Sequence, residues 1–260
     1  METTGGFTTH IRVVIPIVTP GLHEPEEFTA AAGPGTRITV SQIERGPASI
    51  ESEFDDALAA PDTIRKVVEA EREGADAVVI DCMDDPGLLA SREMVSIPVL
   101  GPCQTTMHLA SMLGHTFSVV TVMEGSVPGF ENRAKVYGLA DKLASVRWVD
   151  IPVLDLVASE ERLLGDLLDE SEAAVRRDGA HAIVFGCTGM LGYAAAVERG
   201  LVERGIEGVP VIDPIPATVK MAEAFVALGL TPSKRTYPAP PRKQIVGYAI
   251  PGREPSDLTT

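Results

Sequence analysis

The feature that most constrains the fold of this chain is a segment that occurs twice. Residues 74–82 read GADAVVIDC and residues 179–187 read GAHAIVFGC. In both, a glycine follows a charged helical pattern, and a short apolar run rich in β-branched residues predicts a fully buried strand. A cysteine stands where each strand is expected to end. Cys82 and Cys187 are therefore predicted to occupy equivalent positions in two similar halves.

The likeness extends to both sides of this segment. IPVLGP at residues 97–102 resembles VPVIDP at 209–214, and RVVI at 12–15 resembles SVVT at 118–121. Four predicted strands recur in this way at offsets of roughly 105 to 112 residues. A period of this length indicates a duplicated unit and not a short solenoid repeat.

Strand patterns alternate with helix patterns along the whole chain, which is typical of parallel sheets covered on both faces and predicts the α/β class. Strands are expected at residues 11–15, 36–40, 95–100, 117–122, 146–149 and 209–212, with two more that end at Cys82 and Cys187. Helices are expected at residues 62–73, 104–113, 130–140, 159–177, 190–204 and 218–228. Pro61 is expected to begin the first of these, after a separate short acidic helix capped by Ser49 or Ser52.

The expected division places residues 1–102 with 215–260 in one α/β subdomain and residues 103–214 in the other. Three cysteines, an odd number without the spacing of a disulfide framework, favour reduced thiols and a cytoplasmic location. The first ten residues lack the pattern of a secretory leader, and no apolar run is long enough to span a membrane. A formal charge of −15 argues against nucleic acid as a partner.

Ligands of parallel α/β sheets collect at the carboxyl ends of the strands, where both cysteines are expected. If the halves face each other about a pseudo-twofold axis, the thiols of Cys82 and Cys187 lie on opposite sides of one cleft. Two such groups can remove a proton from a carbon beside a carbonyl and return one on the opposite face. Backbone N–H groups at Met83-Asp84 and Thr188-Gly189 are expected to lower the thiol pKa toward neutrality and to hold a substrate oxygen. A single buried cysteine would more often be a small core residue.

Other candidate residues have simpler interpretations. Cys103 begins a predicted helix and is interpreted as a packing residue, while His108 and His115 are interpreted as exposed or capping residues. His181 is expected at the end of its strand away from the cleft. The pair Asp84-Asp85 precedes Pro86-Gly87 and is better explained as a turn than as a metal site. The run GCTG at 186–189 lacks the lysine and spacing of a phosphate-binding loop, so no nucleotide cofactor and no metal are expected.

Several motifs carry a family resemblance. CMDDPGL at 82–88, LGHTFSVVT at 113–121 and GCTGM at 186–190 resemble the aspartate/glutamate/hydantoin racemase superfamily, and most closely its hydantoin and allantoin racemase branch. GPASIE at 46–51 and YPAPP at 237–241 are similar too. The resemblance implies two flavodoxin-like subdomains with parallel four-stranded sheets, an active site in the cleft between them, cofactor-independent proton transfer between Cys82 and Cys187, and a homo-oligomer.

The chain departs from the family pattern at several positions. Ile15-Pro16-Ile17 stands where relatives read Asn-Pro-Asn, and Thr121-Val122 with Gly125 stands where they carry a Thr-Thr pair and an Arg. Asp81 replaces a small residue. Ile15 and Val122 are therefore expected in the substrate site, with Ser126 and Asn132 near it. The pocket is expected to be more apolar than in the relatives, or built for another ligand.

These features predict a racemase or epimerase of a small cyclic imide or amide, such as a hydantoin or allantoin. Three alternatives stay open on the same scaffold: cis–trans isomerisation of an unsaturated diacid, decarboxylation, and hydrolysis with a cysteine nucleophile. A small-molecule binding protein without turnover is the alternative from another class.

Overall fold

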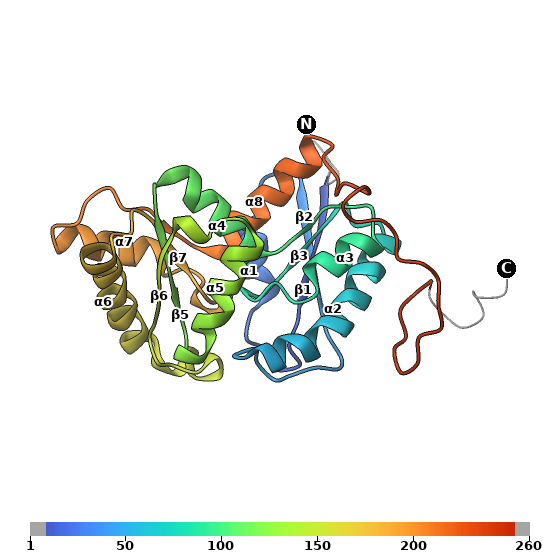
Figure 1. The fold of residues 1–260 in the computed structure, drawn as a ribbon, viewed down its shortest axis with the longest axis horizontal. Coiled ribbons are helices and arrows are strands. Elements are labelled where there is room, and N and C mark those ends of the chain that lie inside the picture. Colours follow the sequence, from blue (N-terminus) through green and yellow to red (C-terminus); the bar gives the residue numbers. More distant parts are fainter. Residues whose placement is uncertain (1–8, 253–260) are drawn as a thin grey trace, which may run out of the picture.

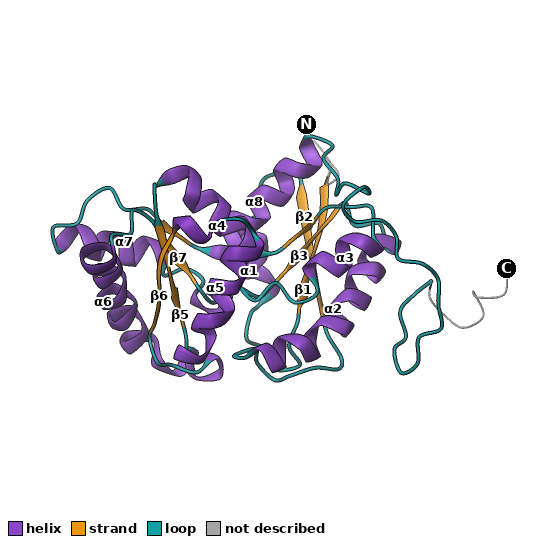
Figure 2. Cartoon of the chain, viewed as in Figure 1, coloured by secondary structure: helices purple, strands orange, loops and turns teal. Residues whose placement is uncertain are grey.

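Two parallel four-stranded sheets lie side by side in the computed structural model, which describes residues 9–252 (Figure 1). The strand order is β2-β1-β3-β4 in the first sheet and β6-β5-β7-β8 in the second, so both halves share one topology. Helices alternate with the strands and cover the faces of the sheets (Figure 2). The predicted α/β class with two similar parallel sheets is confirmed.

The strands are short, and the central ones are fully buried, as their apolar runs predict. Their bounds are β1 (Thr9–Ile15), β2 (Thr36–Gln42), β3 (Ala77–Ile80), β4 (Val99–Leu100), β5 (Phe117–Thr121), β6 (Leu143–Trp148), β7 (Ile183–Phe185) and β8 (Val211–Ile212). The expectation that strands run to the cysteines was wrong by two residues, because β3 ends at Ile80 and β7 at Phe185. The strand expected from residue 95 begins only at Val99. The Val95 N–H instead donates a hydrogen bond to the Ser91 carbonyl oxygen and ends the preceding helix.

The helices connect the strands. Their bounds are α1 (Pro25–Ala31), α2 (Glu53–Arg72), α3 (Leu88–Met94), α4 (Pro102–Leu113), α5 (Val127–Val136), α6 (Glu160–Asp178), α7 (Ala194–Glu203) and α8 (Pro214–Ala227). None of these helices combines the length and the apolar character that crossing a membrane requires.

Helix α2 corrects the prediction that Pro61 begins a helix. One continuous helix contains Pro61, and Ser52 caps it by accepting a hydrogen bond from the Asp55 N–H at 3.2 Å. A proline inside a helix removes one intrahelical hydrogen bond. Buried residues on both sides of it pack into the core of the first half, Ala59 in one cluster and Val67 in another, and this packing holds the two segments in one helix.

Other helices also differ from the prediction: α5 runs from Val127 to Val136 and not over 130–140, and α8 begins at Pro214 and not at residue 218. Helix α1 was missed, although Glu24 and Glu27 form a capping box there and Pro25 occupies the first turn, both of which are visible in sequence. Helix α7 begins at Ala194 and not at residue 190, because Thr188–Met190 forms a separate 3-10 turn after Cys187.

Helices α4 and α8 cross between the halves. Helix α4 packs against β5 and β7 of the second sheet, whereas α8 packs against β1, β3 and β4 of the first, and the two helices contact each other. The proposed division of the chain, residues 1–102 with 215–260 and residues 103–214, stays a prediction. Residues 1–8, on which the expectation of no leader partly rests, and residues 253–260 lie outside the described residues.

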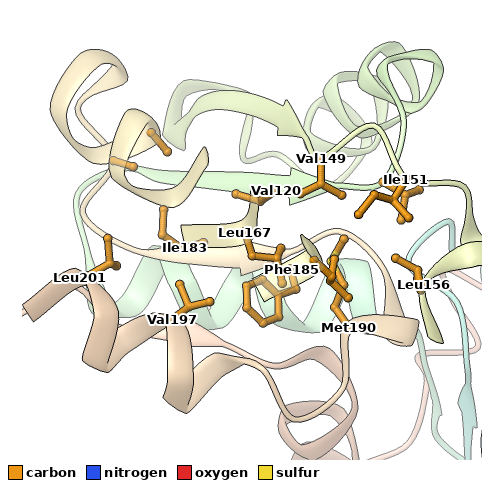
Figure 3. Close-up of a cluster of buried hydrophobic side chains, with 14 of the residues drawn as sticks. Val120, Val149, Ile151, Leu156, Leu167, Ile183, Phe185, Met190, Val197 and Leu201 are labelled. Atoms are coloured by element: carbon orange, nitrogen blue, oxygen red, sulfur yellow. The ribbon is translucent and has the colours of Figure 1, made fainter. Parts of the chain in front are cut away.

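The core of the second half shows what supports the loop that carries Cys187. Side chains of β5 and β7 pack against α6 and α7 in one buried cluster (Figure 3). Phe185, two residues before Cys187, is fully buried between Leu167 and Val197 of these helices. Each such side chain contributes roughly 1.5–3 kcal/mol by leaving water, so the strand end that positions the thiol is firmly held.

Candidate active site

The two cysteines lie in equivalent turns. Cys82 and Cys187 each stand two residues beyond the end of a strand, β3 and β7, that occupies the same place in its sheet. The Cys82 Sγ accepts a hydrogen bond from the Asp84 N–H at 3.4 Å, and the Cys187 Sγ accepts one from the Gly189 N–H at 3.3 Å. The duplicated frame therefore presents each sulfur to the backbone in the same way.

Both cysteines line one cavity between the halves, with a volume of about 40 Å³. Five other residues expected in the site also line it: Met83, Asp84, Val122, Ser126 and Thr188. Ile15 does not, and Ile17 of the following loop lines the cavity instead; Gly189 lies behind Cys187 as its hydrogen-bond donor. Ligand pockets usually measure about 300–1,000 Å³. The cavity is therefore too small for a ring-sized molecule as it stands and must widen to admit one.

The cavity wall is largely apolar, with Ile17, Leu22, Ile50, Val122 and Val153 among its lining residues. Burial raises the pKa of the Cys187 thiol to about 12, and the Gly189 N–H opposes that rise. The expectation that backbone N–H groups bring the thiol pKa toward neutrality was wrong, because one such donor is outweighed by the loss of water around the sulfur.

A carboxylate makes the Cys82 side different. Burial raises the pKa of Cys82 well above its usual range, and the neighbouring Asp84 carboxylate raises it further. The Cys82 thiol donates to Asp84 Oδ2 at 3.8 Å. Asp84 therefore disfavours ionisation of Cys82, whereas the uncharged Gly189 stands at the equivalent position beside Cys187.

Arg133 of α5 holds Asp84 in place. Its Nη2 lies 2.8 Å from Asp84 Oδ1, and its Nε donates to the Asp84 carbonyl oxygen at 2.7 Å. Burial raises the pKa of Asp84 to about 6, against the effect of Arg133. Sequence reasoning missed Arg133, because it lies 49 residues from Asp84 along the chain and no local pattern marks it.

Asp85, the second member of the acidic pair, has a structural role. Its carboxylate accepts hydrogen bonds from the backbone N–H groups of Cys103 and Gln104, at 3.0 and 2.9 Å, and from the Tyr137 hydroxyl at 2.6 Å. It therefore caps α4, and it has no place in the lining of the thiol cavity.

Asp81 and His23 form a buried pair beside Cys82. Asp81 lines the cavity and is 5% exposed, and its Oδ2 lies 3.7 Å from His23 Nε2. Burial raises the pKa of Asp81, while His23 and the Thr188 side chain oppose that rise. His23 was not singled out from the sequence, since a lone histidine in a loop gives no local signal.

The remaining candidates lie away from the cavity. Cys103 is fully buried, and its sulfur contacts Met107 Sδ at 3.9 Å. The rings of His115 and His181 lie 6.5 Å apart at the opposite end of the second sheet, and His108 contacts the Gln104 carbonyl on α4. Asn132 lines a neighbouring hollow with Arg133, and not the cavity that contains the thiols.

Two cysteines from equivalent turns thus line one cavity between two similar parallel α/β units. Comparison with known proteins identifies the family. The model for Asp/Glu/Hydantoin racemase matches residues 25–222. A hydantoin racemase of Pseudomonas sp. (strain NS671) is 40% identical over 240 residues, which is 91% of this chain and 94% of the relative.

Solved structures agree with this. An allantoin racemase from Klebsiella pneumoniae superposes with a TM-score of 0.84 at 35% identity, covering 91% of this chain and 95% of that one. An allantoin racemase from Pseudomonas fluorescens gives a TM-score of 0.84 at 34% identity, covering 92% and 100%. The chain belongs to the Asp/Glu/Hydantoin racemase family, and it is a racemase and hence an isomerase.

Proposed function

We propose that this protein is a cofactor-independent racemase of a small cyclic imide or amide, similar to hydantoin or allantoin, and that Cys82 and Cys187 transfer the protons. The observation that carries the proposal is that both thiols, from equivalent turns of the two halves, line a single cavity. The hydantoin and allantoin racemases that resemble this chain support the substrate class.

The proposed reaction begins with Cys187 as a thiolate and Cys82 as a thiol. Cys187 removes the proton from the stereogenic carbon, and the electron pair of that C–H bond moves to the adjacent carbonyl oxygen to give an enolate. The Cys82 S–H then donates its proton to the opposite face, which forms the new C–H bond and leaves Cys82 as the thiolate. The opposite enantiomer reacts with the roles exchanged.

The charges around the cavity favour a neutral substrate. Two of the residues lining it, Asp81 and Asp84, carry carboxyl groups, and none of its lining residues within 9–252 is Lys or Arg. A substrate carboxylate would meet like charge in a medium that screens it poorly. A cyclic imide brings N–H donors and no carboxylate, so it fits better than an unsaturated diacid or a malonate-type acid.

The hydrolase alternative is disfavoured on different grounds. A nucleophilic cysteine works as a thiolate, usually with a neighbouring base that lowers its pKa. Here none of the described residues lining the cavity is His, Lys or Arg, and the groups next to Cys82 are carboxyl groups, so neither thiol has such a base in the cavity wall. Raised thiol pKa values suit proton transfer at a weakly acidic carbon, because acid and base are then closer in strength to the substrate.

The test is to incubate one pure enantiomer of a 5-substituted hydantoin in deuterated water. The native protein is expected to abolish optical rotation and to introduce one deuterium at the stereogenic carbon. Cys82→Ser and Cys187→Ser are each expected to lower the rate of racemisation by about 10³-fold or more. Cys103→Ala is the matched control, since this thiol is buried outside the cavity, and it should keep near-native activity. Full activity in either serine variant would refute the mechanism, and a mass change without racemisation would indicate hydrolysis.

A further inference from the structure

Asp81 is buried in the active-site cavity without a hydrogen-bond partner. It follows β3 directly, it is 5% exposed, and it lines the same cavity as both thiols. Neither of its carboxylate oxygens accepts a hydrogen bond of ordinary geometry from a described residue, although the Thr188 hydroxyl lies near enough to favour its charged form. A buried carboxylate without donors is costly to the folded protein, and such a group in a cavity is an acceptor available to a ligand.

His23 and Glu27 form a line of polar groups behind Asp81. His23 Nε2 lies 3.7 Å from Asp81 Oδ2, and His23 Nδ1 lies 3.3 Å from Glu27 Oε2. The imidazole is itself buried, with 9% of its surface exposed, and its ring packs against Phe28 at 5.5 Å between centroids. An imidazole fixed between two carboxylates orients the inner one, in the way that outer partners orient functional groups elsewhere.

The Thr188 side chain lies beside Asp81 from the other half of the molecule and also lines the cavity. His23 and Thr188 both favour the charged form of Asp81. The other carboxylate in the wall, Asp84, is already paired with Arg133, so Asp81 is the lining carboxylate without a strong partner. An imide or amide N–H of a bound molecule can donate a hydrogen bond to it.

We propose that Asp81 accepts a hydrogen bond from a ring N–H of the substrate, and that His23, held by Glu27, is the residue that positions Asp81 for this contact. The proposal rests on the cyclic imide or amide function proposed above and names the group that selects for it. It makes Asp81 a specificity-determining residue and assigns proton transfer to the thiols alone.

The experiment measures binding of unsubstituted hydantoin and its two N-methyl derivatives by calorimetry. Hydantoin itself has no stereocentre, so the result is independent of turnover. For the native protein, methylation of one of the two nitrogens should weaken binding by about 10- to 100-fold, because a buried acceptor then loses its donor. Asp81→Leu should bind hydantoin more weakly than the native protein does, by a similar factor. The difference in its affinity for hydantoin and for that methyl derivative should shrink to about threefold or less. Equal discrimination in the native protein and in Asp81→Leu would overturn the proposal.

A second variant at this position separates function from folding. Asp81→Asn is nearly isosteric and keeps a carbonyl acceptor, so it should retain more affinity than Asp81→Leu. Both should melt at or above the native temperature, since they remove an unsatisfied buried charge. A large drop in melting temperature in both would make Asp81 a structural residue and would also overturn the proposal.

The positioning role of His23 is tested separately, by the steady-state kinetics with which the protein racemises a 5-substituted hydantoin. His23→Gln should raise KM more than it lowers kcat, because it weakens binding in the ground state and transition state alike. Its effect should largely vanish in the Asp81→Leu background, since the two residues act through one contact. Additive effects would contradict the role. Asp141→Asn, an exposed substitution, is the control and should change neither binding nor KM. Absence of turnover by the native protein would reject the proposed function, while the calorimetric comparison would still test Asp81.

Discussion

The two thiol sites share a backbone and differ in charge. The sequence around one is DCMD at 81–84, and around the other it is GCTG at 186–189. In both, the N–H two residues after the cysteine donates to the sulfur, at 3.4 and 3.3 Å. Acids stand before and after Cys82 at the positions where glycines flank Cys187. The duplicated frame thus fixes where the sulfurs lie, and the flanking side chains give the two thiols different electrostatic surroundings.

The glycines on the Cys187 side are needed for close packing. A Cβ at Gly186 would lie 2.6 Å from the Thr121 Cβ, and one at Gly189 would lie 2.8 Å from Leu156 Cδ1. Backbone and aliphatic groups occupy the space that Asp81 and Asp84 use in the first half. A charged side chain at either glycine would therefore require its neighbours to move.

The largest effect expected from changing the charges around the two thiols comes from Asp84→Asn. Removing the carboxylate next to Cys82 lowers the pKa of that thiol, because one cause of its rise disappears while Arg133 stays nearby. In a Cys103→Ala/Cys187→Ser background, alkylation of Cys82 by iodoacetamide at pH 8 should become roughly 3- to 10-fold faster. Alkylation rates measured across pH give the comparison directly.

The matched control measures alkylation of the other thiol, Cys187. In a Cys103→Ala/Cys82→Ser background, the same Asp84→Asn change should accelerate alkylation of Cys187 less, because burial and then the Gly189 N–H affect Cys187 more strongly than Asp84 does. Equal acceleration of both thiols would mean that Asp84 does not distinguish them.

A smaller effect is expected on stability from Asp56, which extends the charged cluster on the Cys82 side. Its Oδ2 lies 3.8 Å from Arg133 Nη2, and burial raises its pKa to about 6. The folded state then binds this proton more tightly than the unfolded state does, so ionisation of Asp56 lowers stability as pH rises from about 4 to about 7. The stability of Asp56→Asn relative to that of the native protein should therefore increase with rising pH.

The measurement is the melting temperature of both proteins at pH 4.5 and pH 7.5. The melting temperature of Asp56→Asn should exceed that of the native protein by more at pH 7.5 than at pH 4.5. In a protein of this size the increase is roughly 2–4 °C for each kcal/mol by which ionisation of Asp56 destabilises the native fold. The exposed substitution Asp141→Asn should show no such trend. A constant difference at the two pH values would show that Asp56 ionises as easily in the folded protein as in the unfolded one.

Much of the fold was predictable because local patterns of apolar residues specify its strands and helices, and because the same unit occurs twice. The apolar runs before Cys82 and Cys187 specify buried parallel strands, and their equivalence predicts that both thiols face one site. Pro61 shows where local rules failed: its preference for a helix first turn lost to packing of the flanking residues on the sheet.

The electrostatic part of the site could not be predicted in the same way. Arg133 and His23 reach the cysteine loop from distant segments, and only the tertiary structure brings them there. The thiol pKa values were expected to fall, because the donating N–H groups are visible in sequence while the degree of burial is not. The pocket was expected to be more apolar than in the relatives, or built for another ligand, on account of Ile15 and Val122. Asp81 adds a polar group to its wall from another strand end.

The central claim is that the two sulfurs serve opposite faces of one carbon. It is tested most directly by giving each pure enantiomer of a 5-substituted hydantoin to Cys82→Ser and to Cys187→Ser in deuterated water. Each variant keeps one base, so it should introduce deuterium without inversion into one enantiomer only. The enantiomer should differ between the two variants, and Cys82→Ser, which keeps Cys187, should exchange faster. Exchange of the same enantiomer by both variants would contradict the account.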